Sequence, residues 1–183
     1  LTPTGLVFGR GAQVSVGSLV PPTGKISDAD FAKGDYRITG ASEGVLVNQA
    51  ALQAKNGSIV LAAGKVSNFG EITAENGNVN LAAGESFKLA LDNAGLMNVT
   101  VDQAGVDAQV LNAGLVATQG GKVLLTARGR DMLLDSVVKN DGVVRAKGMS
   151  IVGGQVVLDG GDGAVDNNGQ IDVSNAAGKG GEA

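Results

Sequence analysis

A seventeen-residue segment occurs twice in this chain, twenty residues apart, and it constrains the fold more than any other feature. The first copy spans residues 48–64 (NQAALQAKNGSIVLAAG) and the second spans residues 68–84 (NFGEITAENGNVNLAAG). In a gapless alignment eight positions are identical, and Leu52 and Ile59 of the first copy become Ile72 and Val79 in the second. A repeat of about twenty residues is typical of a solenoid, whose units are stable only when they stack.

Each copy carries strand and turn signals. Two short alternating segments, around residues 52–54 and 59–61 in the first copy, are separated by an Asn-Gly pair. Twenty residues are too few for a strand and a full helix, and the residues between the turns are β-branched or small. We therefore predict an all-β fold, a parallel β-helix with coils of about 20–22 residues that stack about 4.8 Å apart. Leu52 would lie on Ile72, Leu61 on Leu81 and Asn48 on Asn68.

Weaker copies of the repeat continue toward the C-terminus. Residues 112–127 align with the segment that starts at Asn68, forty-four residues earlier, which fits two coils. The intervening coil would turn at residues 93–95 and carry extra residues around 87–91 or 101–106. Further copies begin at Asn140 and Asn167, and their spacings of 28 and 27 predict loops on one side of the stack, with residues 131–136 as the expected place.

The copies share an Asn-x-Gly pattern, for which a structural role is predicted. Glycine permits a positive backbone angle at a tight corner, and a laddered asparagine can bond its own turn and the neighbouring coils. A functional asparagine site is the alternative. The positions concerned are Asn68, Gly70, Asn112, Gly114, Asn140 and Gly142.

Residues 1–44 differ from residues 45–183, which read as continuous coils. All three prolines and three of the five aromatic residues lie in the first part. We expect two short strands within residues 5–20, a loop at residues 21–24 and a strand at residues 36–39. Residues 27–33 look like one helical turn, with Ser27 or Asp28 as the N-cap.

Composition excludes several classes of function. The net charge is −4 with 17% charged residues, so no nucleic-acid partner is expected. The densest basic group, Lys122, Arg128 and Arg130, has Asp131 and Asp135 beside it and is interpreted as a solvated face. No apolar run approaches eighteen residues, which predicts no membrane span. The chain has no signal-like start and ends within a repeat, so we expect a piece of a longer protein.

The chain has neither cysteine nor histidine, which removes disulfides, thiolate or imidazole metal sites and histidine-based catalysis. Groups of aspartates remain as candidates for a polysaccharide-acting enzyme, but acidic residues near glycine-rich turns are usually solvated. We predict no enzyme activity and no cofactor. Residues 160–166 (GGDGAVD) approximate a calcium-binding nonapeptide, with Asp162 and Asp166 as candidate ligands, but the unit does not recur at nine residues.

Four segments carry a resemblance to a known family. They are residues 5–20 (GLVFGRGAQVSVGSLV), 26–31 (ISDADF), 98–103 (NVTVDQ) and 121–138 (from GKVLLTA to LDSVV). In this order they resemble the filamentous-haemagglutinin-type exoproteins of Gram-negative two-partner secretion. The resemblance implies a right-handed parallel β-helix, an N-terminal secretion domain recognised by an outer-membrane partner transporter, and a long shaft.

The resemblance also implies roles for particular residues. An Asn-Pro-Asn-Gly secretion motif normally stands where this chain has Thr2, Pro3, Thr4 and Gly5, so threonine replaces both asparagines and the Pro-Gly turn is kept. Residues 1–44 would belong to the secretion domain, and the later coils would run into the shaft. The implied function is that of a secreted cell-surface adhesin with a host-cell or bacterial receptor or a polysaccharide as ligand. The alternatives are the shaft of a contact-dependent growth inhibition toxin and a polysaccharide-acting β-helix enzyme.

Overall fold

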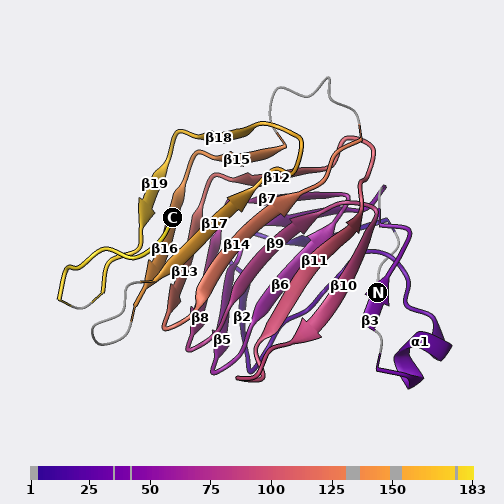
Figure 1. Ribbon diagram of the computed structural model, residues 1–183, viewed down its shortest axis with the longest axis horizontal. Coiled ribbons are helices and arrows are strands. Elements are labelled where there is room, and N and C mark those ends of the chain that lie inside the picture. Colours follow the sequence, from indigo (N-terminus) through magenta and orange to yellow (C-terminus); the bar gives the residue numbers. More distant parts are fainter. Residues whose placement is uncertain (1–3, 35, 42, 131–136, 149–153, 176) are drawn as a thin grey trace.

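The chain winds into a stack of coils bounded by three parallel sheets (Figure 1). The computed structural model describes residues 4–34, 36–41, 43–130, 137–148, 154–175 and 177–183. Each complete coil contributes one strand to each sheet in the same order, and each strand pairs with its equivalents in the coils before and after it. The predicted all-β parallel β-helix is therefore confirmed.

The first and second sheets have six strands each. The strands of the first sheet are β1 (Gly5–Phe8), β4 (Val45–Asn48), β7 (Lys65–Asn68), β12 (Gln109–Asn112), β15 (Val138–Asn140) and β18 (Val165–Asn167). Those of the second sheet are β2 (Gln13–Val16), β5 (Ala51–Lys55), β8 (Glu71–Glu75), β13 (Leu115–Gln119), β16 (Val143–Lys147) and β19 (Gln170–Asp172).

The third sheet has four strands, and single bridges extend it at both ends. Leu19 of the first coil pairs with Ile59, and Glu182 pairs with Gln155 at the other end. The strands are β6 (Ile59–Ala63), β9 (Val79–Ala83), β14 (Lys122–Ala127) and β17 (Gln155–Asp159).

The register between coils follows the repeat alignment. Leu52 lies opposite Ile72, Asn48 opposite Asn68, and Leu81 between Leu61 and Leu125. Inward-facing aliphatic side chains from all three sheets form one continuous core along the stack. Because neighbouring coils repeat the same residue types at these positions, each apolar side chain packs against its own kind above and below.

The 44-residue step between Asn68 and Asn112 contains no intervening coil, so that prediction is wrong. Strand β12 pairs directly with β7, and β13 and β14 pair directly with β8 and β9. The extra residues form an antiparallel hairpin, β10 (Ser86–Leu91) and β11 (Met97–Gln103), and the expected coil corner at residues 93–95 lies in its exposed turn. An Asn-x-Gly sequence closes a hairpin as readily as a coil corner, so the pattern alone could not distinguish them.

The hairpin belongs to a fourth sheet, outside the stack, with the order β11-β10-β3. Strand β3 (Tyr36–Ile38) comes from the segment between the first and second coils, which also holds the short helix α1 (Asp28–Ala32). The side chain of Ser27 accepts a hydrogen bond from the Asp30 amide at 3.0 Å, so Ser27 is the N-cap. Figure 1 shows these elements gathered at the N-terminal end of the stack.

This fourth sheet covers the outer face of β6 and β9. Val60, Ala62 and Ala82 point outward from these strands, yet all three are fully buried against the fourth sheet. Phe87 is the largest buried side chain of this second core. Strands β6 and β9 are thus buried on both faces, unlike β5 and β8, whose outer faces meet solvent.

The longer spacings of the last coils arise at two corners and not at one. Between Asn112 and Asn140 the extra residues fall between β14 and β15, and between Asn140 and Asn167 they fall between β16 and β17 and in residues 160–164, between β17 and β18. The loop expected at residues 131–136 lies outside the described residues.

Candidate functional site

The asparagines of the Asn-x-Gly pattern form one ladder of side-chain amides along the corner between the first and second sheets. Each Nδ2 donates to the Oδ1 of the next asparagine at 2.8, 2.8, 2.8 and 2.7 Å. The first four members are fully buried and the last is exposed. In chain order the members are Asn48, Asn68, Asn112, Asn140 and Asn167.

The ladder also satisfies the corner backbone. Asn68 Oδ1 accepts from the Gly70 amide at 3.3 Å, and Asn112 Oδ1 accepts from the Gly114 amide at 3.4 Å. These local bonds hold each turn, while the amide-to-amide bonds join one turn to the next. In this arrangement the asparagines are committed to the protein itself.

The glycines of the pattern are placed for a reason other than the one predicted. Gly70, Gly114 and Gly142 do not have positive φ angles. Instead, a Cβ on Gly114 would overlap the carbonyl oxygen of Gly70, and a Cβ on Gly142 would overlap that of Gly114. These glycines therefore allow successive coil corners to lie in close contact.

Positive φ angles occur at the next corner, between the second and third sheets. Asn56 and Asn76 have φ values of 55° and 51°, and Asn76 Nδ2 donates to Asn56 Oδ1 at 3.0 Å. Asparagine tolerates this left-handed conformation better than most residues. The Asn-Gly pairs of the repeat thus divide the two tasks, with the asparagine making the turn and the glycine allowing the close approach.

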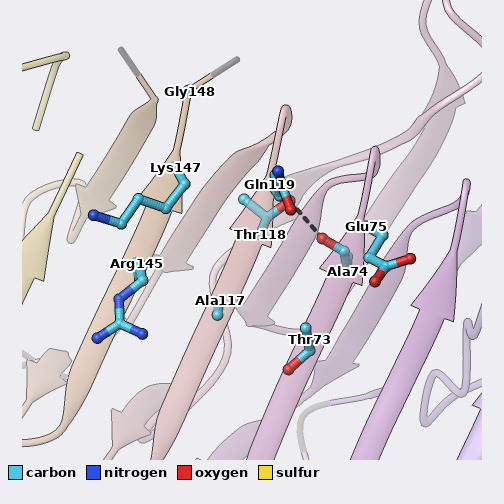
Figure 2. A pocket seen from close by; sticks show the side chains of 9 residues that line it. All are labelled: Thr73, Ala74, Glu75, Ala117, Thr118, Gln119, Arg145, Lys147 and Gly148. Carbon is cyan, nitrogen blue, oxygen red and sulfur yellow. Dashed lines mark hydrogen bonds between the residues drawn. The ribbon is translucent and has the colours of Figure 1, made fainter. Parts of the chain in front are cut away.

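A depression of about 350 Å³ lies on the outer face of the second sheet (Figure 2). It exists because Ala117 has a small side chain where the neighbouring coils place Thr73 and Arg145 in the same row. Figure 2 shows Ala117 on the strand between these two residues, with the Arg145 and Lys147 side chains on one side and Thr73 and Glu75 on the other. Its outward-facing lining residues are Thr73, Glu75, Ala117, Gln119, Arg145 and Lys147.

The wall of the depression on the β16 side is held by ion pairs to the next coil. Lys147 Nζ lies 2.7 Å from Asp172 Oδ2 and donates to Ser174 Oγ at 2.6 Å. Arg145 Nε lies 3.6 Å from the same carboxylate. The hydrogen bond from Lys147, together with those from the Ser174 hydroxyl and amide, lowers the pKa of Asp172, so this carboxylate is ionised at neutral pH.

The floor of the depression is joined to the neighbouring coil by a buried side chain. The Thr118 hydroxyl points into the stack, donates to the Ala74 carbonyl at 3.0 Å and also contacts the Gly77 carbonyl. Thr118 is buried and joins coils forty-four residues apart in sequence. A preformed depression on paired strands is the kind of surface on which a small ligand binds without rearrangement of the backbone.

The comparison with known families settles what kind of domain carries these features. The model of the TPS secretion domain matches residues 1–173 of the 183. The chain belongs to the TPS secretion domain family. Members of this family are exported through the outer membrane by two-partner secretion, which uses a partner transporter. The family is one of secretion domains and not of enzymes.

A solved structure agrees with this assignment at the level of the fold. The HMW1 secretion domain from Haemophilus influenzae superposes with a TM-score of 0.78 at 23% sequence identity, over 95% of this chain and 45% of that chain. The TPS domain described here thus spans less than half the length of that structure. A comparison with curated proteins found no match.

Two of the four residues that resemble the secretion motif, Thr4 and Gly5, lie at the start of the first coil. Thr4 is exposed, and Gly5 opens β1 opposite Val45 with a φ of 148°. A Cβ on Gly5 would lie 2.7 Å from the Val45 carbonyl oxygen, so glycine is required there. Thr2 and Pro3 lie outside the described residues.

The candidate calcium ligands are not gathered into a described metal site. Asp162 lies in an exposed turn, and Asp166 lies in β18, where it accepts a hydrogen bond from Asn168 at 3.0 Å. Within the described ranges no group of three or more His, Cys, Asp or Glu side chains is placed to hold a metal ion. None of the helices in the same ranges has the length and apolarity of a membrane span.

Two of the three members of the basic group singled out in the sequence pair with acidic side chains. Arg128 makes a bidentate pair with Asp159 at 2.7 and 2.9 Å, and Arg130 pairs with Glu85. Asp131 and Asp135 lie outside the described residues. Sequence reasoning missed the depression, because the intervening coil expected between Asn68 and Asn112 would have separated Ala117 from Thr73, whereas β13 pairs directly with β8.

Proposed function

We propose that this TPS domain is the secretion and folding unit of a surface adhesin, with its coils continuing into a filamentous shaft. Its partners would be the outer-membrane transporter and a receptor or polysaccharide on a host cell or another bacterium. The observation that carries the proposal is the unbroken vertical pairing of equivalent residues, above all the amide ladder from Asn48 to Asn167.

This pairing supports a mechanism in which one coil is the template for the next. Each coil exposes a full set of unpaired strand edges until the following coil pairs with them, and a lone coil cannot bury its apolar face. Folding of successive coils would therefore draw the emerging chain outward without another energy source.

Export with the partner transporter tests the folding role. Leu81 is fully buried between Leu61 and Leu125, so Leu81→Asp places an unpaired charge inside the stack. We expect the amount of exported, protease-resistant protein to fall at least about tenfold, in line with the cost of burying a charge. Gln53→Asp, on the exposed outer face of β5, is the matched control and should be exported normally. Equal export of both variants would contradict the proposal.

Adherence tests the second half of the proposal. Bacteria that produce the parent protein and its transporter should adhere to host cells or to one another, and bacteria that lack the parent protein should not. Export without any gain in adherence would remove the adhesin role and leave the secretion role standing.

A further inference from the structure

The depression over Ala117 has polar groups around it that the protein does not use. The terminal nitrogens of Arg145, the Glu75 carboxylate and the Gln119 side-chain amide have no hydrogen-bond or ion-pair partner among the described residues. Arg145 Nε is buried and also lacks a hydrogen bond there, since Asp172 Oδ2 at 3.6 Å is too distant for one. A guanidinium that is held in place while its terminal N–H groups remain free can bind a carboxylate.

The charges around the depression are unequal on its two sides. Arg145 and Lys147 share a single carboxylate, Asp172, so the β16 side carries one excess positive charge. The opposite side carries the carboxylate of Glu75, for which the described part of the chain supplies no ion-pair partner. A ligand that fits must present an anionic group at one end and hydrogen-bond donors at the other.

We propose that this depression binds a saccharide that carries a carboxylate, a uronic acid unit. Its carboxylate pairs with the terminal nitrogens of Arg145, and its hydroxyl groups donate to Glu75 and to the Gln119 side-chain oxygen. The methyl group of Ala117 and the aliphatic stems of Arg145 and Lys147 contact the apolar face of the sugar ring. The volume of about 350 Å³ falls within the range of small-molecule sites and suits one sugar unit.

The same features disfavour other anions. Glu75 repels a densely charged polyanion, whose second charge would lie against it. A neutral sugar leaves the excess charge on the β16 side unpaired. The inference rests on the adhesin part of the proposed function, for which it names a ligand class, whereas export and shaft formation do not require an occupied depression.

The test is titration of the protein with glucuronic acid, followed by amide chemical shifts in NMR. Glucuronamide, which has the same shape without the charge, and glutamate, which has a carboxylate without the sugar ring, are the comparison probes. We expect saturable shifts around Ala117 and Arg145 with glucuronic acid only. Saturation by glutamate would assign the depression to acidic peptides, and equal saturation by glucuronamide would make the charge irrelevant, so either result would overturn the proposal.

Three variants test the assignment to this depression. Arg145→Gln removes the guanidinium and should weaken glucuronic acid binding at least about tenfold, which is the size expected for a lost charged hydrogen bond. Ala117→Gln fills the depression and should weaken binding at least about tenfold by excluding the sugar ring. Arg37→Gln is the control, because it removes an arginine paired with Asp102 in the fourth sheet and should leave binding unchanged. Undiminished binding by Ala117→Gln, with a native NMR spectrum, would place the ligand elsewhere. Absence of saturable binding to the wild type would end the proposal without affecting the export assay.

Discussion

Asn68 donates its side-chain amide to the oxygen of Asn112 at 2.8 Å, although the two residues are forty-four positions apart. An entire hairpin and its connections lie between them in sequence and none of it lies between them in space. The helical stack therefore tolerates large insertions at a corner as long as the amide ladder and the strand register resume.

Asn112→Leu should destabilise the stack substantially. The substitution keeps the size of the side chain but leaves the fully buried Asn68 amide and Asn140 oxygen without their ladder partners. We expect the free energy of unfolding to fall by about 2–4 kcal/mol, because each buried polar group left without a hydrogen bond costs about 1–3 kcal/mol. Urea denaturation followed by circular dichroism measures it. Asn168→Ala, one residue beyond the exposed end of the ladder, is the control and should change the free energy of unfolding by less than about 0.5 kcal/mol. Similar losses in both variants would show that the ladder does not stabilise the stack more than an exposed asparagine does.

Gly114→Ala should also destabilise, for a steric reason. The added methyl group would overlap the Gly70 carbonyl oxygen of the coil below, so two corners would have to separate. Overpacking of this kind costs about 1–3 kcal/mol. Gly17→Ala is the control, since a Cβ there meets no atom within 4 Å and its φ is not positive. Thermal unfolding of the two variants should differ clearly, and equal midpoints would show that the corners can move apart freely.

The fold class was predictable from the sequence because the repeat encodes the register directly. Leu52 aligns with Ile72 in sequence and lies opposite it in space. The hairpin was not predictable from its turn, because residues 93–95 have the same Asn-Ala-Gly sequence as the coil corner at residues 112–114. A signal did exist elsewhere: β6 (IVLAA) lacks the polar alternation of β5 (ALQAK), which indicates a strand covered on both faces.

The depression shows a second limit of sequence reasoning. Ala117, Thr73 and Arg145 share a row only because the insertions after coils three and four leave the register intact. Spacings of 44 and 28 residues do not reveal which residues leave the stack. Packing does not restrict the side chains on an outer face, so they leave no repeating pattern in the sequence. The inward rows, in contrast, repeat the same residue types from coil to coil.

Phe87→Ala tests whether the fourth sheet is an integral part of the fold. Phe87 is fully buried against the outer face of β6 and β9, so its truncation should cost about 3–5 kcal/mol. Phe69→Ala removes the same side chain from an exposed corner, where it is 52% exposed, and should cost far less. Hydrogen exchange should show that the Phe87 variant loses protection first in β3, β10 and β11. Uniform loss of protection along the stack would mean that the fourth sheet and the coils unfold as one unit.

Arg128→Gln should change the acid dependence of stability. The Arg128 guanidinium, which forms a bidentate pair with Asp159, holds the pKa of that carboxyl below its ordinary value of 3.8. A carboxyl whose pKa is lower in the folded state stabilises the fold above its unfolded pKa, and this contribution disappears as the pH falls through the folded-state value. Because the two side chains are 35% and 38% exposed, the contribution near neutral pH should be only about 0.2–1 kcal/mol. Wild type and variant should therefore differ in free energy of unfolding at about pH 7 and converge as the pH falls below about 4.

Arg10→Gln removes an exposed arginine with no ion-pair partner among the described residues, and its difference from the wild type should not follow this curve. A constant offset between wild type and Arg128→Gln across the whole range would show that the arginine acts through packing of its stem and not through its pair with Asp159.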